Sequence, residues 1–149
     1  MRTAAGFTLP ELLIVMTVLA ILVAAGLPSF GEFVRNQRLK TASFDLFSTL
    51  VVARSEAINR NASVTLAPVV AGNWSGGWTV TAAGGTVIRS QEAIPDITIA
   101  GPDNLVYSGS GRLSGAVAQF SLTASGSNVV NRCISIDLSG RPVSKAAAC

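Results

Sequence analysis

A single carboxylate stands inside the most apolar part of the chain, and it is the residue with the clearest chemical possibility. Glu11 is the only charged residue in the 24 positions from Phe7 to Phe30. A charge in such a run costs about 2.5–3.5 kcal/mol on membrane-insertion scales and is usually retained for a function. If the chain is cut between Gly6 and Phe7, the freed amine lies four residues before Glu11. The Glu11 carboxylate of one subunit could then pair with the Phe7 ammonium of a neighbour and fix their axial register, because leaving either charge unpaired in apolar surroundings is costly.

The second chemical feature is a pair of cysteines, Cys133 and Cys149, within the last 17 residues. In an oxidising compartment the expected use is a disulfide, whereas in the cytosol both would stay free thiols. A bridge would close a loop of about 16 residues and contribute about 3 kcal/mol in the chain-entropy model.

Other catalytic or metal-binding chemistry finds little support in the residue types. The chain has no histidine and only two cysteines, which argues against general acid–base catalysis of the common kind and against a four-ligand zinc centre. No glycine-rich loop leads into a helix as a phosphate site requires. The acidic residues that could serve a calcium loop are scattered, at Asp96, Asp103 and Asp137. We expect no enzyme activity, no cofactor and no metal.

The element that must hold Glu11 is an apolar N-terminal segment. The chain has 149 residues, 49% of them hydrophobic and 13% charged, with a net charge of +3. Met1 to Gly6 carry one cation, Arg2, and the apolar run that follows is about the 20 residues that a membrane-spanning helix needs. Arg2 then keeps the N-terminus cytoplasmic and sends the rest to the periplasm.

Three interpretations of this segment compete: a secretory signal cleaved near Val23-Ala24-Ala25, a plain membrane anchor, and a prepilin leader. Glu11 favours the third, because neither a signal peptide nor an anchor needs a carboxylate there. The run Gly6-Phe7-Thr8-Leu9-Pro10-Glu11 resembles the class III signal of type IV pilins and type II secretion pseudopilins. The resemblance implies that a prepilin peptidase cleaves after Gly6 and methylates Phe7. Pro10 departs from the usual aliphatic residue, but proline is tolerated near a helix N-terminus.

Beyond this segment the pattern predicts one long helix, from Thr8 to about Asn61. Pro28 removes a backbone hydrogen bond and should kink it. Past Pro28 apolar residues recur at spacings of 3 and 4, which predicts a helix lying against a domain. These residues are Leu39, Ala42, Leu46, Leu50, Ala53 and Ala57.

From Ala62 onward the composition changes to Val, Thr, Ser and Gly, with short alternating runs separated by turn residues. The predicted strands are Ser63–Leu66, Gly77–Thr81, Thr86–Arg89, Ile97–Ala100, Leu105–Tyr107, Val117–Thr123 and Cys133–Leu138. We therefore expect an α+β fold in which the long helix packs on an antiparallel sheet or small β-sandwich, as in pilins. The expected parts are a leader (1–6), a transmembrane or filament-core helix (7–28), the amphipathic half of the helix (29–61) and a periplasmic β domain (62–149).

Three short motifs resemble the GspH/FimT group of minor pilins and pseudopilins. They are Ala53-Arg54-Ser55-Glu56-Ala57-Ile58, Trp74-Ser75-Gly76-Gly77-Trp78 and Ser139-Gly140-Arg141. Trp74 and Trp78 are expected to be packing residues, because large aromatics supply much of a small domain's buried area. The resemblance implies a minor pilin that helps to prime a type IV pilus; the alternative is pseudopilin H of a type II secretion system. The partners implied are other pilins, the prepilin peptidase and the bacterial inner membrane, and the location is single-pass in that membrane, then in a filament.

A further alternative is a minor pilin that binds DNA for uptake in natural transformation. Some FimT-type pilins carry a basic C-terminal motif after Gly-Arg, which here would begin at Gly140-Arg141. The second arginine of that motif is absent, with Val143 in its place. Arg132, Arg141 and Lys145 remain as candidate phosphate contacts, against the simpler interpretation of a solvated tail.

Overall fold

A computed structural model describes residues 8–149, apart from the side chains of residues 25–29. The chain forms two compact units, Met1–Val34 and Arg35–Cys149. One helix, α1 (Leu9–Arg60), contributes to both of them.

In the first unit, α1 has no covered face up to residue 24. The side chains of residues 8–24 are all exposed, including those of Leu12, Leu13, Ile14 and Leu22. Among the residues that the structure describes, no helix is both long enough and apolar enough to cross a membrane.

In the second unit, the predicted helical stripe forms one wall of the core. Leu39, Leu46, Leu50, Ala53 and Ala57 are each 0% exposed, as the spacing of the apolar residues predicts.

The helix ends at Arg60 with a C-terminal cap. Asn61 has a positive φ of 47°, a left-handed conformation that asparagine tolerates better than most residues. Its N–H donates to the Ile58 carbonyl, and the N–H of Ala62 donates to the Ala57 carbonyl. This is the hydrogen-bond pattern of a Schellman cap, so the chain leaves the helix where the sequence indicated.

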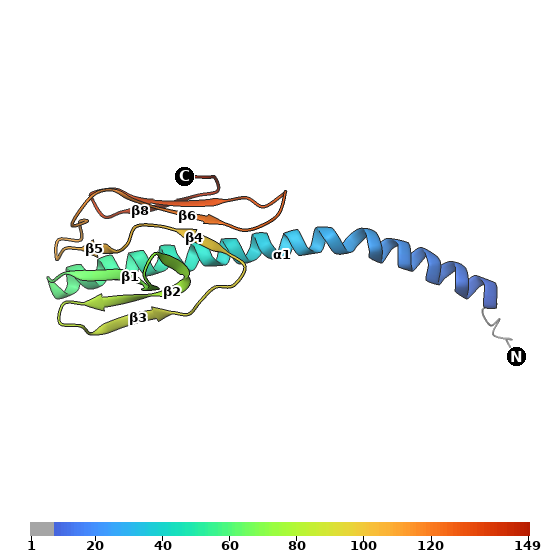
Figure 1. Ribbon diagram of the computed structural model, residues 1–149, viewed down its shortest axis with the longest axis horizontal. Coiled ribbons are helices and arrows are strands. Elements are labelled where there is room, and N and C mark those ends of the chain that lie inside the picture. The colour runs from blue at the N-terminus through green and yellow to red at the C-terminus, as the bar shows by residue number, and fades with distance from the viewer. Residues whose placement is uncertain (1–7) are drawn as a thin grey trace, which may run out of the picture. The chain divides into compact units, whose positions relative to one another are not determined.

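The remainder of the second unit consists of two four-stranded antiparallel sheets. The first has the strand order β3-β2-β1-β5 and the second β4-β6-β7-β8. In Figure 1 the two sheets flank the C-terminal part of α1. The strands are β1 (Val64–Val70), β2 (Asn73–Ala82), β3 (Val87–Gln91), β4 (Thr98–Ala100), β5 (Leu105–Tyr107), β6 (Ala118–Thr123), β7 (Arg132–Ile136) and β8 (Pro142–Lys145).

Helix and sheets share one core, and two tryptophans lie in it. Trp74 and Trp78 are 0% exposed, which confirms their predicted packing role. Trp74 meets Phe120 of the other sheet edge-on, with ring centroids 4.8 Å apart, so it joins the two sheets. Each indole N–H has a partner: Trp74 donates to the Pro102 carbonyl and Trp78 to the Thr49 hydroxyl.

The α+β architecture and the antiparallel strands are therefore as predicted. Several strands differ from the sequence analysis: β1 runs to Val70 and β7 ends at Ile136, against the expected Leu66 and Leu138. β2 starts at Asn73, several residues before the expected Gly77, and β8 was not expected at all.

Candidate functional site

The first of the predicted site residues lie outside the described residues. Gly6 and Phe7, the predicted cleavage and methylation positions, both lie there. Glu11 is in the first turn of α1, where a carboxylate is favoured by the helix dipole. Its side chain is exposed and makes no ion pair with any described residue. Glu11 therefore remains available to a partner from another molecule.

Pro28 lies within α1, and the helix continues through it to Arg60. The chain thus tolerates this proline without ending the helix. The kink at Pro28 stays a prediction.

The two cysteines form a disulfide, with their Cα atoms 5.0 Å apart. Cys133 pairs with Lys145 across the β7–β8 ladder, while its neighbour Ile134 faces the core. Since successive strand residues point to opposite faces, Cys133 lies on the outer face of the second sheet. The Cys149 sulfur is also 3.2 Å from the carbonyl oxygen of Phe120 in β6. The bridge thus draws the C-terminal tail back from β8 across this outer face.

The three candidate DNA-binding cations do not share one surface. Arg132 is directly opposite the buried Leu122, so it lies on the inner face of the sheet. Lys145 is opposite Cys133 and lies on the outer face. Arg141 precedes the other end of β8, about 13 Å from Lys145 at the rise of an extended strand.

The motif Ser139-Gly140-Arg141 forms a turn that packs against the rest of the unit. Asp137 accepts hydrogen bonds from the Ser139 hydroxyl and the Arg141 N–H. The Ser139 hydrogen bond is the main reason that the pKa of Asp137 lies below its ordinary value. Gly140, with φ +79°, lies directly against the Gly111 carbonyl and the Tyr107 ring.

A hydrogen bond from α1 holds the turn at Gly111. Arg54 Nε donates to the Gly111 carbonyl at 3.0 Å. Arg54 and Ser139-Gly140-Arg141 therefore belong to one structural junction, in which two motifs far apart in the sequence meet at Gly111.

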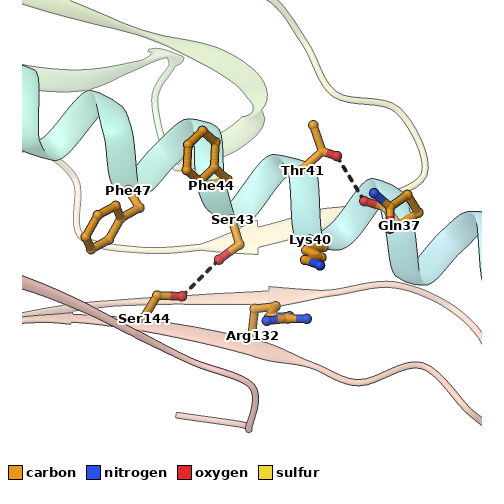
Figure 2. A pocket seen from close by; sticks show the side chains of 8 residues that line it. All are labelled: Gln37, Lys40, Thr41, Ser43, Phe44, Phe47, Arg132 and Ser144. Atoms are coloured by element: carbon orange, nitrogen blue, oxygen red, sulfur yellow. Dashed lines mark hydrogen bonds between the residues drawn. The ribbon is translucent and has the colours of Figure 1, made fainter.

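A groove on the second unit is the feature that the sequence analysis missed. It encloses about 530 Å³ between α1 and the β7–β8 hairpin (Figure 2). Two cations, Lys40 and Arg132, point into it from opposite sides, and Phe44 and Phe47 supply its apolar surface. Gln37, Thr41, Ser43 and Ser144 complete the lining, and the hydroxyls of Ser43 and Ser144 are 3.2 Å apart.

One signal for this groove was present in the sequence. Phe44 falls outside the apolar stripe of the helix, and an aromatic residue there has no core to enter. The structure leaves its side chain 68% exposed. For metal chemistry, the described residues contain no group of three or more His, Cys, Asp or Glu side chains placed to hold an ion.

Comparison with known proteins agrees with this architecture. The family model described as type II transport protein GspH matches residues 42–140, and the model described as the prokaryotic N-terminal methylation motif matches residues 1–27. No curated protein matches closely enough to be counted a relative.

Two crystal structures of the type IV minor pilin FimU from Pseudomonas aeruginosa (strain PAO1) share the fold. At 21% sequence identity, one superposes with a TM-score of 0.66 over 76% of this chain and 92% of its own. The other, in a different space group, is also 21% identical and gives 0.63 over 71% and 91%.

Proposed function

The chain belongs to the family of the type II transport protein GspH, and from this we propose that it is a minor pilin, a structural and assembly-priming subunit of a type IV pilus. The alternative within the same class is pseudopilin H in the periplasmic pseudopilus of a type II secretion system. The fold shared with a minor pilin favours the pilus.

The observation that carries the proposal is Glu11. It stands at the start of a helix whose described side chains up to residue 24 are all exposed, and no described residue of its own chain pairs with it. An N-terminal methylation motif covers the same residues. An apolar helix with an unpaired carboxylate is unfavourable for an isolated molecule and is stabilised when neighbouring helices cover it.

The proposed sequence of events follows from these residues. The precursor sits in the inner membrane with its second unit in the periplasm. The prepilin peptidase cuts after Gly6, and the Phe7 amine of one subunit then pairs with the Glu11 carboxylate of the next. The energetic gain is the removal of an unpaired charge from apolar surroundings, and the geometric result is a fixed axial register.

The test compares filament incorporation of Glu11→Gln and Glu11→Ala with that of Thr17→Ala. Thr17 is a matched control, because it lies on the same helix and its hydroxyl only bonds the Leu13 carbonyl one turn earlier. We expect both Glu11 variants to insert into the membrane as well as wild type and to enter filaments at least about tenfold less, whereas Thr17→Ala enters normally. Normal incorporation of Glu11→Gln would refute the pairing mechanism.

Mass spectrometry of the mature chain tests the class itself. A methylated Phe7 at the N-terminus is expected. A mature chain beginning at Gly26 would instead identify an exported protein cut by an ordinary signal peptidase, and the assembly role would be lost.

The DNA-uptake role is less well supported by the geometry. Arg132 and Lys145 are on opposite faces of one sheet, and Arg141 is at the far end of β8. A duplex could therefore meet only part of this set at one time, which favours the assembly role over duplex recognition.

A further inference from the structure

The second sheet ends in a short strand with a free edge. β8 is the last strand in the order β4-β6-β7-β8, and among the described residues no strand pairs with its outer side. An edge strand presents unpaired N–H and C=O groups that can bind another extended chain.

The chain's own C-terminal tail does not cover this edge. After Lys145 the tail crosses the outer face of the sheet, where Cys149 is bonded to Cys133 of β7 and reaches the Phe120 carbonyl of β6. The disulfide therefore holds the tail on the side away from the free edge.

The helix face next to the edge carries two aromatic side chains that are not fully covered. Ser43 lies under β8, where it meets Ser144. Successive residues of a helix are about 100° apart around its axis. Going around the helix away from Ser43, the next side chains are therefore those of Phe47, Lys40 and Phe44, in that order. A strand added beside β8, about 4.8 Å further on, would lie over these side chains. Phe44 is now 68% exposed and Phe47 is only partly buried.

The charge of the groove selects the kind of chain that fits. Lys40 and Arg132 both line it, and none of its lining residues is acidic. The Nε atom of Arg132 is buried and has no hydrogen-bond partner among the described residues. The residue as a whole is only partly buried, so its guanidinium can still meet a carboxylate from outside.

We propose that the free edge of β8 and the adjoining groove bind an extended segment of another pilin-like subunit, one that carries an acidic and a large apolar side chain two residues apart, on the same face of the strand. The segment adds as a fifth strand to the second sheet. Its apolar side chain covers Phe44 and Phe47, and its carboxylate meets Lys40 and Arg132. The aromatic surface and the strand edge favour a peptide over a nucleic acid. Phosphates would leave the aromatic side chains uncovered and would not pair with the row of N–H and C=O groups of the edge. The inference rests on the proposed assembly function and names the contact through which it acts.

The test places a photoreactive p-benzoylphenylalanine at position 44 of the full-length chain, in cells that assemble the filament. The control carries the same residue at position 87, since Val87 is 58% exposed and belongs to β3, an edge strand of the other sheet. Irradiation at position 44 should give at least about tenfold more adduct than at position 87. Mass spectrometry should map the adduct to an extended segment of a different pilin-like subunit, with an acidic and an apolar residue two positions apart.

A second variant tests the charge requirement. Lys40→Glu, at an exposed position, should reduce the position 44 adduct about tenfold without changing formation of the disulfide. Equal adducts at positions 44 and 87, an adduct with DNA, an adduct with a second copy of this chain, an adduct on a helical segment, or indifference to Lys40→Glu would each overturn the proposal.

The amount of the chain found in filaments distinguishes a failure of the docking contact from a failure of the assembly function. If the chain enters filaments but gives no adduct at position 44, the docking proposal fails and the assembly function stands. If the wild-type chain enters no filament, the assembly function fails and the docking proposal fails with it.

Discussion

At the scale of single residues, Tyr107 is the clearest source of pH dependence. Its side chain is fully buried, and its hydroxyl has no hydrogen-bond partner within the described part of the chain. Burial raises the pKa of this phenol from 10.0 to about 12, although the nearby Arg54 guanidinium acts in the opposite direction. The folded state therefore keeps the phenol proton in a range where the unfolded chain loses it.

The first prediction concerns Tyr107→Phe. Between about pH 10 and pH 12 the unfolded state binds fewer protons, so the free energy of unfolding of the wild type should fall with rising pH, by up to about 2.7 kcal/mol. The variant should lack this fall, and at pH 7 it should be about 1 kcal/mol more stable because an unpartnered buried hydroxyl is removed. Urea denaturation across this pH range measures both effects, and an identical alkaline fall in the variant would contradict the assignment.

The second prediction concerns Gly140, which lies against the Gly111 carbonyl with φ +79°. A Cβ there would both strain the backbone and collide with that carbonyl, so Gly140→Ala should lower the free energy of unfolding by roughly 3 kcal/mol or more. Gly72→Ala is the matched control: φ is also positive, at +74°, but no heavy atom lies within 4 Å of the new Cβ. It should cost only about 1 kcal/mol. Equal losses in the two variants would show that the close contact contributes nothing.

At the scale of elements, local rules predicted the helix better than the end of the second sheet. The helix stop near Asn61 and the buried stripe from Leu39 to Ala57 depend on neighbours in the sequence, and both appear as expected. β8 could not be found this way. Pro142-Val143-Ser144-Lys145 shows no clear alternation, and it becomes a strand because the turn at Asp137–Gly140 returns it to β7. Strand pairing that depends on tertiary contact is invisible to a local pattern.

The same reasoning accounts for the groove. The sequence identified Arg132 as a candidate phosphate contact, but only the register of β7 against β6 and β8 shows that it faces α1 and Lys40. Strand pairing decides which face of the sheet a side chain occupies. A register shift of one residue would have placed Arg132 on the outer face.

The third prediction belongs to the β7–β8 hairpin and its disulfide. Replacing both Cys133 and Cys149 by serine should lower the free energy of unfolding by about 3 kcal/mol, because the bridge closes a loop with a sequence separation of 16 residues. Denaturation of the full-length chain in detergent micelles, with and without a thiol reductant, measures this. The reductant should destabilise the wild type by a similar amount and leave the double variant unchanged. A wild type indifferent to reduction would contradict a stabilising role for the bridge.

At the scale of the whole molecule, the net charge of +3 is too small to indicate nucleic-acid binding by itself. The fourth prediction therefore sets an upper limit on the salt dependence of any DNA binding. If the full-length chain binds duplex DNA through Arg132, Arg141 and Lys145, the slope of log affinity against log salt should be no steeper than about −2.7, from about −0.9 per phosphate contact. Fluorescence titration at several salt concentrations measures the slope. A steeper slope, or binding unaffected by Arg141→Ala with Lys145→Ala, would mean that other cations carry the contact.

One consequence of the continuous helix concerns mechanical load. The helix that begins at Leu9 is the same one whose apolar stripe, from Leu39 to Ala57, packs in the core of the second unit. Tension that reaches Leu39 therefore acts along a helix whose inner face is packed in that core. To extract the helix, many side-chain contacts must break together, whereas a strand pulled from a sheet edge separates one pair at a time. This packing is suited to resisting a lengthwise pull on the helix.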